Sequence, residues 1–115
     1  MPDDVADIDL VAIPDAAQAL GVPTTRIDQW IREGALLAVR DAAGRRRVPA
    51  AFIQGSSVVK GLPGVVTLLR DGGYADDEIV TWLFRSDDSL PGTPIQALRE
   101  NRGSEVKRRA QVAGY

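Results

Sequence analysis

Two groups of polar and basic side chains in the first half of this 115-residue chain have the chemistry to contact a nucleic acid. The first group lies within residues 24–32 and the second within residues 40–47. A guanidinium group pairs with phosphate oxygens or with guanine O6 and N7, an amide pairs with adenine, and a hydroxyl can hold a phosphate. The candidate DNA-binding residues are Thr24, Thr25, Arg26, Gln29, Arg32, Arg40, Arg45, Arg46 and Arg47.

The charged residues are arranged in blocks that the net charge of −2 conceals. Residues 1–15 carry five aspartates and no basic residue, whereas residues 16–60 carry a net charge of +4. The sign changes to −4 over residues 61–98 and to +3 over residues 99–115. Such blocks predict a local basic face on a chain that is slightly acidic as a whole.

The composition excludes several classes of function. The chain has neither cysteine nor histidine, which rules out a disulfide framework, a zinc finger, a thiol nucleophile and an imidazole base. The acidic runs at 76–78 and 87–88 are better explained as a helix start and a solvated loop than as a cation site. We therefore expect a non-enzymatic protein with no metal ion or other cofactor.

The apolar fraction and the lack of long apolar runs are typical of a folded protein of the cytoplasm. They make up 44% of the chain, and 115 residues are enough for one ordinary domain or two small ones. No apolar run approaches the roughly 18 residues of a membrane helix, and the amino terminus is acidic where a secretory signal is basic. These features predict a cytoplasmic location and no contact with a membrane.

Residues 10–34 carry the pattern of two helices joined by a short turn. Pro14 suits a first helical turn, and Gly21 is placed to end the first helix in a left-handed conformation. In the second helix apolar residues recur at spacings of three and four until Gly34. Two helices connected in this way form a helix-turn-helix.

The start of the second helix has several capping candidates. Thr24 or Thr25 is expected to cap it, and Thr25 with Asp28 matches a capping box. Trp30 falls on the apolar stripe of this helix, as Trp82 does on a later one. We interpret both tryptophans as core residues rather than as residues that stack on bases.

After the second helix the apolar period changes to two. Residues 36–48 predict a two-stranded β-hairpin, with turn-forming residues at 41–44 between the strands. Alternation places the outer two arginines of residues 45–47 on one side of the return strand and the middle one on the other. Three adjacent positive charges repel one another unless a polyanion compensates them, which favours a wing that touches DNA.

The remainder of the chain is predicted to be helical, with breaks at its glycines. Pro49 can begin a short helix that carries Phe52 and Ile53. Three acids at 76–78 suit the first turn of a later helix, and residues 93–96 combine a capping box with proline at the first helical position. The sequence thus predicts that helices dominate the second half of the chain.

Residues 12–53 resemble the winged helix-turn-helix of MerR and excisionase-type proteins. The resemblance rests on Ala-Leu-Gly-Val before the second helix, Trp-Ile-Arg-Glu-Gly at its end, and a basic hairpin that closes with Val-Pro. It implies a recognition helix in the major groove and a small wing on the DNA backbone. Metal-sensing members carry effector cysteines and a long dimerisation helix, and this chain has neither.

Over nearly its whole length the chain more closely resembles an actinobacterial family of small DNA-binding proteins. The mycobacterial member of that family is the substrate of a Ser/Thr protein kinase, and phosphorylation of a threonine in its amino-terminal tail is understood to abolish DNA binding. This chain has no Ser or Thr before Thr24, so that switch does not carry over. If a kinase acts here, the candidate acceptors are Thr24, Thr25, Ser56 and Ser57.

Residues 73–99 also resemble the toxin-binding domain of Xre/MbcA/ParS antitoxins, which holds a partner protein. The stretches that carry this resemblance begin with Gly-Tyr at 73–74 and end with Ala-Leu-Arg at 97–99. The other interpretation of this region is a helical support that packs on the winged helix.

Together these features predict a mainly α fold. A flexible acidic tail, residues 1–9, precedes a winged helix-turn-helix with a small two-stranded β-hairpin wing, residues 10–55, and a C-terminal helical subdomain, residues 56–115. The expected function is sequence-specific binding of double-stranded DNA, as a transcriptional regulator. The alternative is a protein–protein adaptor or antitoxin-like module in which the C-terminal half binds a partner protein.

Overall fold

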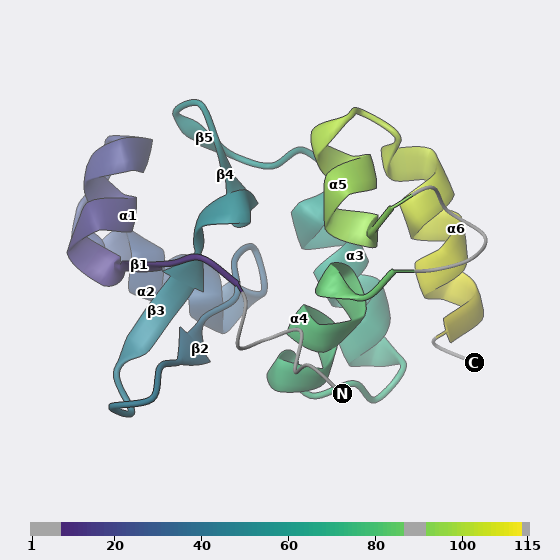
Figure 1. Cartoon of the computed structure of the whole chain (residues 1–115), viewed down its shortest axis with the longest axis horizontal. Coiled ribbons are helices and arrows are strands. Elements are labelled where there is room, and N and C mark those ends of the chain that lie inside the picture. The colour runs from purple at the N-terminus through teal and green to yellow at the C-terminus, as the bar shows by residue number, and fades with distance from the viewer. Residues whose placement is uncertain (1–7, 87–91, 114–115) are drawn as a thin grey trace.

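Six α-helices, one 3₁₀ turn and five short strands make up the part of the chain that the computed structural model describes, residues 8–86 and 92–113. The elements before residue 50 lie on one side of the molecule, and the four helices after residue 61 pack together on the other (Figure 1). This mainly helical architecture with a small antiparallel sheet confirms the predicted fold class.

The first two helices form the predicted helix-turn-helix. α1 (Ile13–Leu20) has Pro14 in its first turn, and α2 (Thr24–Glu33) follows after a short turn. Each helix ends at a glycine in the left-handed conformation, with φ of 68° at Gly21 and 82° at Gly34. The positive φ explains why glycine stands at both positions.

The start of α2 differs from the prediction. Pro23, with φ of −70° and ψ of 158°, is the N-cap, and no side chain caps the helix. Thr24 is already helical because the proline ring fixes the backbone that leads into the first turn. Asp28 pairs with Arg46 instead of joining a capping box. The predicted caps at Thr24 or Thr25, and the predicted capping box, are therefore wrong.

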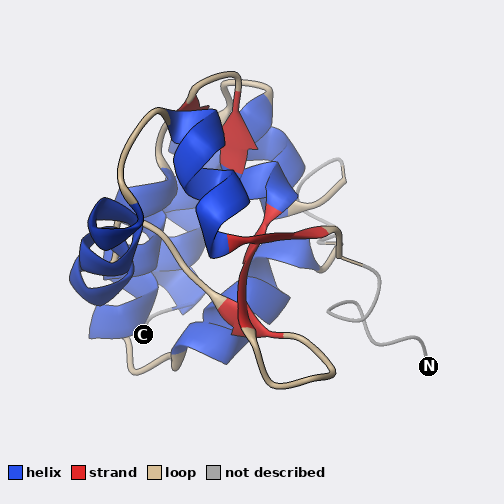
Figure 2. Ribbon diagram, turned by 90° about the vertical axis from the view of Figure 1, so that its left-hand side faces the viewer, coloured by secondary structure: helices blue, strands red, loops and turns tan. Residues whose placement is uncertain are grey.

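The predicted two-stranded wing is present and is extended to a three-stranded antiparallel sheet. β2 (Val39–Arg40) and β3 (Arg46–Pro49) form the expected hairpin, and β1 (Leu10–Ala12) pairs with the other edge of β3. Val11 lies opposite Val48, and the strands face the viewer in Figure 2. The sequence did not predict β1 because three residues directly before a helix show no two-residue period.

The chain just before β1 is also held in place. Residues 1–7 of the predicted tail lie outside the described residues. Ile8 packs against the core, and the carbonyl oxygen of Asp9 accepts a hydrogen bond of 2.8 Å from the N–H of Ala50. The last two residues of the stretch that was expected to be flexible, Ile8 and Asp9, thus contact the folded part of the chain.

A tight connection leads from the sheet to the C-terminal helices. Pro49 precedes η1 (Ala50–Phe52), a 3₁₀ turn at the place of the predicted short helix. Its expected partner Ile53 lies instead in β4 (Ile53–Gln54), which pairs with β5 (Ser57–Val58) as a second hairpin. Two-residue strands carry no periodic signal, so the sequence did not predict this hairpin.

Four helices form the C-terminal half of the chain. They are α3 (Leu62–Asp71), α4 (Asp76–Phe84), α5 (Pro94–Arg99) and α6 (Gly103–Ala113). The predicted capping box of α5 is confirmed, since Gln96 N donates to Thr93 Oγ1 at 3.2 Å and Thr93 N donates to Gln96 Oε1 at 3.0 Å. The acids at the start of α4 are also confirmed, whereas the loop predicted at 87–88 lies outside the described residues.

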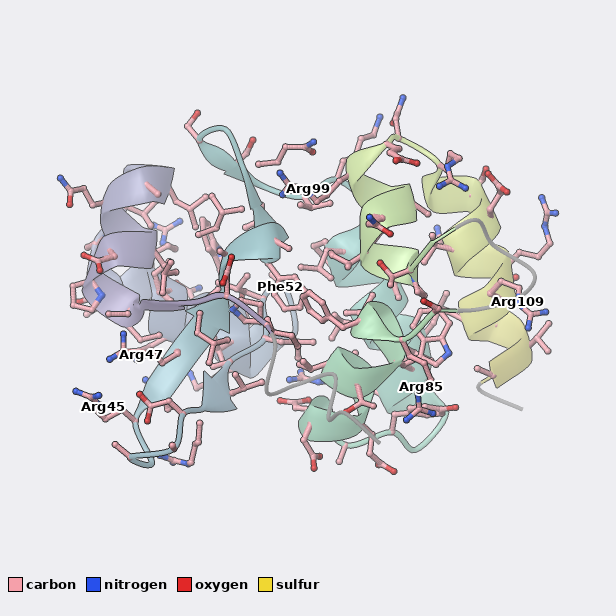
Figure 3. The ribbon with its side chains drawn as sticks, in the orientation of Figure 1. Arg45, Arg47, Phe52, Arg85, Arg99 and Arg109 are labelled. Atoms are coloured by element: carbon pink, nitrogen blue, oxygen red, sulfur yellow. The ribbon has the colours of Figure 1, made fainter. Side chains whose placement is uncertain are left out.

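One hydrophobic core spans both halves of the molecule. Phe52 and Leu83 are fully buried in it, and Trp30 and Trp82 are half-buried and pack against it, as core residues should. The ring centroids of Phe52 and Phe84 lie 5.7 Å apart. Figure 3 shows Phe52 between the two groups of elements. The helix-turn-helix and the C-terminal helices therefore share their packing.

Gly34→Ala should destabilise the fold more than Gly21→Ala. An alanine costs about 1–2 kcal/mol in the left-handed conformation that both glycines adopt. A Cβ at Gly21 would meet nothing within 4 Å, whereas a Cβ at Gly34 would lie 2.8 Å from Nη1 of Arg70. That guanidinium is bonded to Asp76, so its displacement adds to the destabilisation. Urea unfolding of both variants measures the difference, and equal effects would contradict it.

Candidate nucleic-acid interface

The outward face of α2 carries five of the candidate residues. Ile27 is fully buried and Ile31 is half-buried, so the helix is anchored by one side. Gln29 Nε2 donates to Glu33 Oε2 at 3.0 Å. The exposed candidates on the other side are Thr24, Thr25, Arg26, Gln29 and Arg32.

Two arginines on this face are available to an anion. Arg26 and Arg32 are exposed, and neither forms an ion pair with the residues that the structure describes. They stand six positions apart on α2, with Gln29 midway between them. Residues three apart on a helix are neighbours on one face, so the three side chains form a row.

Asp41 organises the tip of the wing. Its Oδ1 accepts hydrogen bonds of 2.9 Å from the backbone N–H groups of Ala43 and Arg45. Its Oδ2 lies 2.9 Å from Nε of Arg47 and 3.3 Å from Nε of Arg45. One carboxylate thus shapes the turn and holds two arginines on the same side of the wing. In Figure 3 these two arginines lie on the side away from the C-terminal helices.

Arg46 is directed to the other side of the wing, toward α2. Its Nη2 lies 2.5 Å from Oδ1 of Asp28. The alternation predicted for residues 45–47 is therefore confirmed. Arg40, on the neighbouring strand, donates from Nη1 to the carbonyl oxygen of Gly44 at 2.7 Å. Because the Asp28–Arg46 pair joins α2 to the wing, the two groups of candidate residues adjoin in the folded chain.

The positive charges of the wing are compensated in part within the chain. Asp41 lies against Arg45 and Arg47, and Asp28 lies against Arg46, so part of the predicted repulsion is relieved without a polyanion. The Arg45 and Arg46 side chains are 68% and 42% exposed, so solvent and salt screen these pairs. Exposed pairs contribute only about 0–1 kcal/mol each. A phosphate can therefore take Arg45 and Arg46 from their carboxylate partners at little cost.

The environment of Asp41 lowers its pKa to about 2. The largest cause is the hydrogen bond from the backbone N–H of Arg45, and the guanidinium of Arg47 and the N–H of Ala43 act in the same direction. Partial desolvation of the carboxyl opposes them. Asp41 is consequently ionised at neutral pH, where it keeps the wing turn in place.

Sequence reasoning missed the two aspartates of this surface. The Asp-Ala-Ala-Gly sequence at 41–44 is typical of a turn in which the aspartate side chain accepts from the backbone, and this signal could have identified Asp41. No local signal pairs Asp28 with Arg46, which lies 18 positions away. That pair exists only because the fold brings Arg46 of β3 to Asp28 of α2.

Two further properties concern metal ions and membranes. Within residues 8–86 and 92–113, no group of three or more acidic residues gathers in a way that could hold a metal ion. None of the helices in the same described ranges is long and apolar enough to cross a bilayer.

Comparison with known proteins places this arrangement in a family. Residues 2–53 match the winged helix-turn-helix domain described for the DNA-binding protein Rv2175c, and residues 59–114 match the Rv2175c C-terminal domain of unknown function. The DNA-binding protein Rv2175c of Mycobacterium tuberculosis (strain ATCC 25618 / H37Rv) is 42% identical over 127 aligned positions, which cover 98% of this chain and 87% of the relative. The chain belongs to the Rv2175c family.

A solved structure of the Rv2175c family has the same fold. The NMR structure of Rv2175c matches this chain with a TM-score of 0.85 at 42% identity, over 95% of this chain and 83% of the other. The resemblance of the whole chain to a family of small DNA-binding proteins is thus confirmed. The narrower resemblances to MerR proteins and to antitoxin domains stay predictions.

The wing turn should lose its anchor only in strong acid. The folded pKa of Asp41 lies below its usual value of 3.8, so its stabilising contribution is complete above about pH 4 and disappears as the pH falls through about 2. A carbon-13 NMR titration of the Asp41 carboxyl should give a midpoint near 2. Arg47→Gln should raise that midpoint, and a wild-type midpoint near 3.8 would contradict the assignment.

Proposed function

We propose that this chain binds double-stranded DNA sequence-specifically, with α2 in the major groove and the wing on the phosphate backbone. The observation that carries the proposal is that α2, which exposes Arg26 and Arg32, is joined to the arginine-rich wing by the Asp28–Arg46 pair. Membership of the Rv2175c family supports it, since the Mycobacterium tuberculosis relative is named a DNA-binding protein.

The dimensions of α2 suit a major groove. Its ten residues span about 15 Å, and a groove about 12 Å wide admits an α-helix. Arg26 and Gln29 are separated by about 4.5 Å along the helix axis, which places them near neighbouring base pairs. We assign Arg26, Gln29 and Arg32 to base edges. Thr24 and Thr25 have hydroxyls that make no cap and would contact phosphates at the groove edge.

The wing arginines would bind the DNA backbone beside the groove, with phosphates taking the place of their aspartate partners. Arg40, Arg45, Arg46 and Arg47 neutralise phosphates, while Asp41 and Asp28 give up part of their pairing. Arg45 is the most exposed of the paired arginines and makes the longest contact with Asp41, so it is the easiest to turn toward DNA. Phosphate contacts of this kind set the affinity and make it dependent on salt.

We further propose that DNA binding serves transcriptional regulation. A single winged helix binds weakly, so tight binding to an operator would require a dimer or a cooperative array. A cytoplasmic location, a Ser/Thr kinase partner and a protein partner for residues 56–115 stay predictions from the sequence. A phosphate on Thr25 would add a charge of about −2 to the proposed DNA-contacting face and repel the backbone.

Replacing Arg45, Arg46 and Arg47 with alanine should weaken binding to a random duplex. The slope of log affinity against log salt should also become shallower, by about one for each phosphate that the wing no longer neutralises. Fluorescence anisotropy at several salt concentrations measures both quantities. The matched control is Lys60→Ala with Lys107→Ala and Arg108→Ala, which removes the same charge from exposed positions outside the interface.

The control triple variant should bind almost as the wild type does. Equal weakening by the two triple variants would mean that affinity follows net charge rather than the wing. No binding by the wild type at low salt would refute the proposed function itself.

Arg26→Ala should reduce discrimination between DNA sequences. A bidentate contact to a base contributes about 1–3 kcal/mol of discrimination. The affinity for a duplex selected by the wild type should therefore fall by more than the affinity for a random duplex. Arg45→Ala, which removes a phosphate contact, should weaken both duplexes alike. If Arg45→Ala lowered discrimination and Arg26→Ala weakened both duplexes alike, the wing rather than α2 would contact the bases.

A further inference from the structure

Arg70 reaches from α3 to the end of α2. Its Nη2 donates to the carbonyl oxygen of Ile31 at 3.3 Å, across 39 positions of sequence. The same oxygen accepts from the N–H of Gly34 at 3.3 Å, and the carbonyl groups of the last turn carry the negative end of the helix dipole. A guanidinium at this place therefore stabilises the end of α2 and attaches it to the C-terminal half.

Asp76 fixes the direction of the Arg70 side chain. Nε and Nη2 of Arg70 donate to the two carboxylate oxygens at 2.9 and 2.8 Å, a bidentate geometry. Asp76 is the first residue of α4, where the helix dipole favours an acid. The Arg70 side chain is 29% exposed, less than those of Arg45 and Arg46 in the wing, and its Asp76 partner is 42% exposed. The guanidinium is held from both sides.

Gly34 has no side chain, and this absence leaves room for the guanidinium of Arg70 beside the end of α2. A Cβ at this position would lie 2.8 Å from Nη1 of Arg70 and 3.6 Å from Cγ1 of Val66. Both neighbours belong to α3. The residue that ends α2 therefore also allows α3 to approach it closely, and α2 is fitted to the C-terminal half at its last turn.

We propose that the C-terminal half orients α2 for DNA recognition, with Arg70 as the positioning residue. This inference rests on the proposed DNA binding, and it gives a role to a domain described as of unknown function. Arg70 acts through the Ile31 carbonyl and is not assigned a contact with DNA. Hydrogen bonds to base edges weaken steeply with misalignment, so a small tilt of α2 would disturb the row from Arg26 to Arg32.

The first arm of the test measures the orientation of α2 without DNA. Residual dipolar couplings of nitrogen-15-labelled protein report the direction of the α2 N–H bonds relative to α3 and α6. Arg70→Gln removes the charge and the bidentate pair and should shift the α2 couplings. Arg70→Lys keeps a charge and one donor and should give an intermediate shift.

The second arm measures recognition with two duplexes, one random and one selected by the wild type from a random pool. Arg70→Gln should lower the ratio of the two affinities by about tenfold, the value of one misaligned base contact. Affinity for the random duplex should change little. A decrease in fold stability alone would reduce the active fraction equally for both duplexes and leave the ratio unchanged.

Arg102→Gln is the matched control. Arg102 has a side chain that is 25% exposed and pairs with Glu100 and Glu105 within the C-terminal half. The same substitution there should move neither the α2 couplings nor the affinity ratio.

The outcomes separate this inference from the proposed function. If the wild type prefers its selected duplex and Arg70→Gln leaves the ratio or the couplings unchanged, positioning by Arg70 is overturned while DNA binding stands. If the wild type binds no duplex, or selects none, the proposed function fails and this inference fails with it. A shift in both measurements, absent in Arg102→Gln, supports the assignment.

Discussion

The structure depends on how α2 is held between the wing and the C-terminal half. Near the middle of α2, Asp28 pairs with Arg46 of the wing. Near the end of the helix, the carbonyl oxygen of Ile31 accepts a hydrogen bond from Arg70. Ile27 is fully buried in the core that both halves share. Protein cores are close-packed, so α2 cannot turn without opening a void around Ile27. Its exposed face is therefore presented in one direction.

The two halves are joined by polar contacts as well as by apolar packing. Arg99 Nη1 donates at 2.9 Å to the carbonyl oxygens of both Ala51 and Ile53, and Figure 3 shows this arginine at the junction. An isolated two-stranded hairpin is marginally stable in water, so the short β4–β5 hairpin needs such support. The ring contact between Phe52 and Phe84 adds apolar packing at the same boundary. The C-terminal helices thus brace the connection as well as α2.

Local sequence signals predicted the helices well and the short strands poorly. The glycines that end α1 and α2 and the capping box of α5 each depend on a few neighbouring residues, and all were found in the sequence. The capping box proposed for α2 failed because Asp28 had two possible partners and a distant arginine, Arg46, was the one it met. β1 failed because a three-residue strand is defined by its pairing with β3 rather than by its own pattern.

The sequence by itself determined the helix-turn-helix, the basic wing, and which α2 side chains face outward, because helical periodicity and strand alternation are local properties. Only the tertiary structure decided how charge is distributed on the resulting surface. It placed Asp41 and Asp28 against the wing arginines and left Arg26 and Arg32 without such partners among the described residues. It also brought Arg70 to the end of α2. Ion pairs between distant residues depend on distances that exist only after the core has packed.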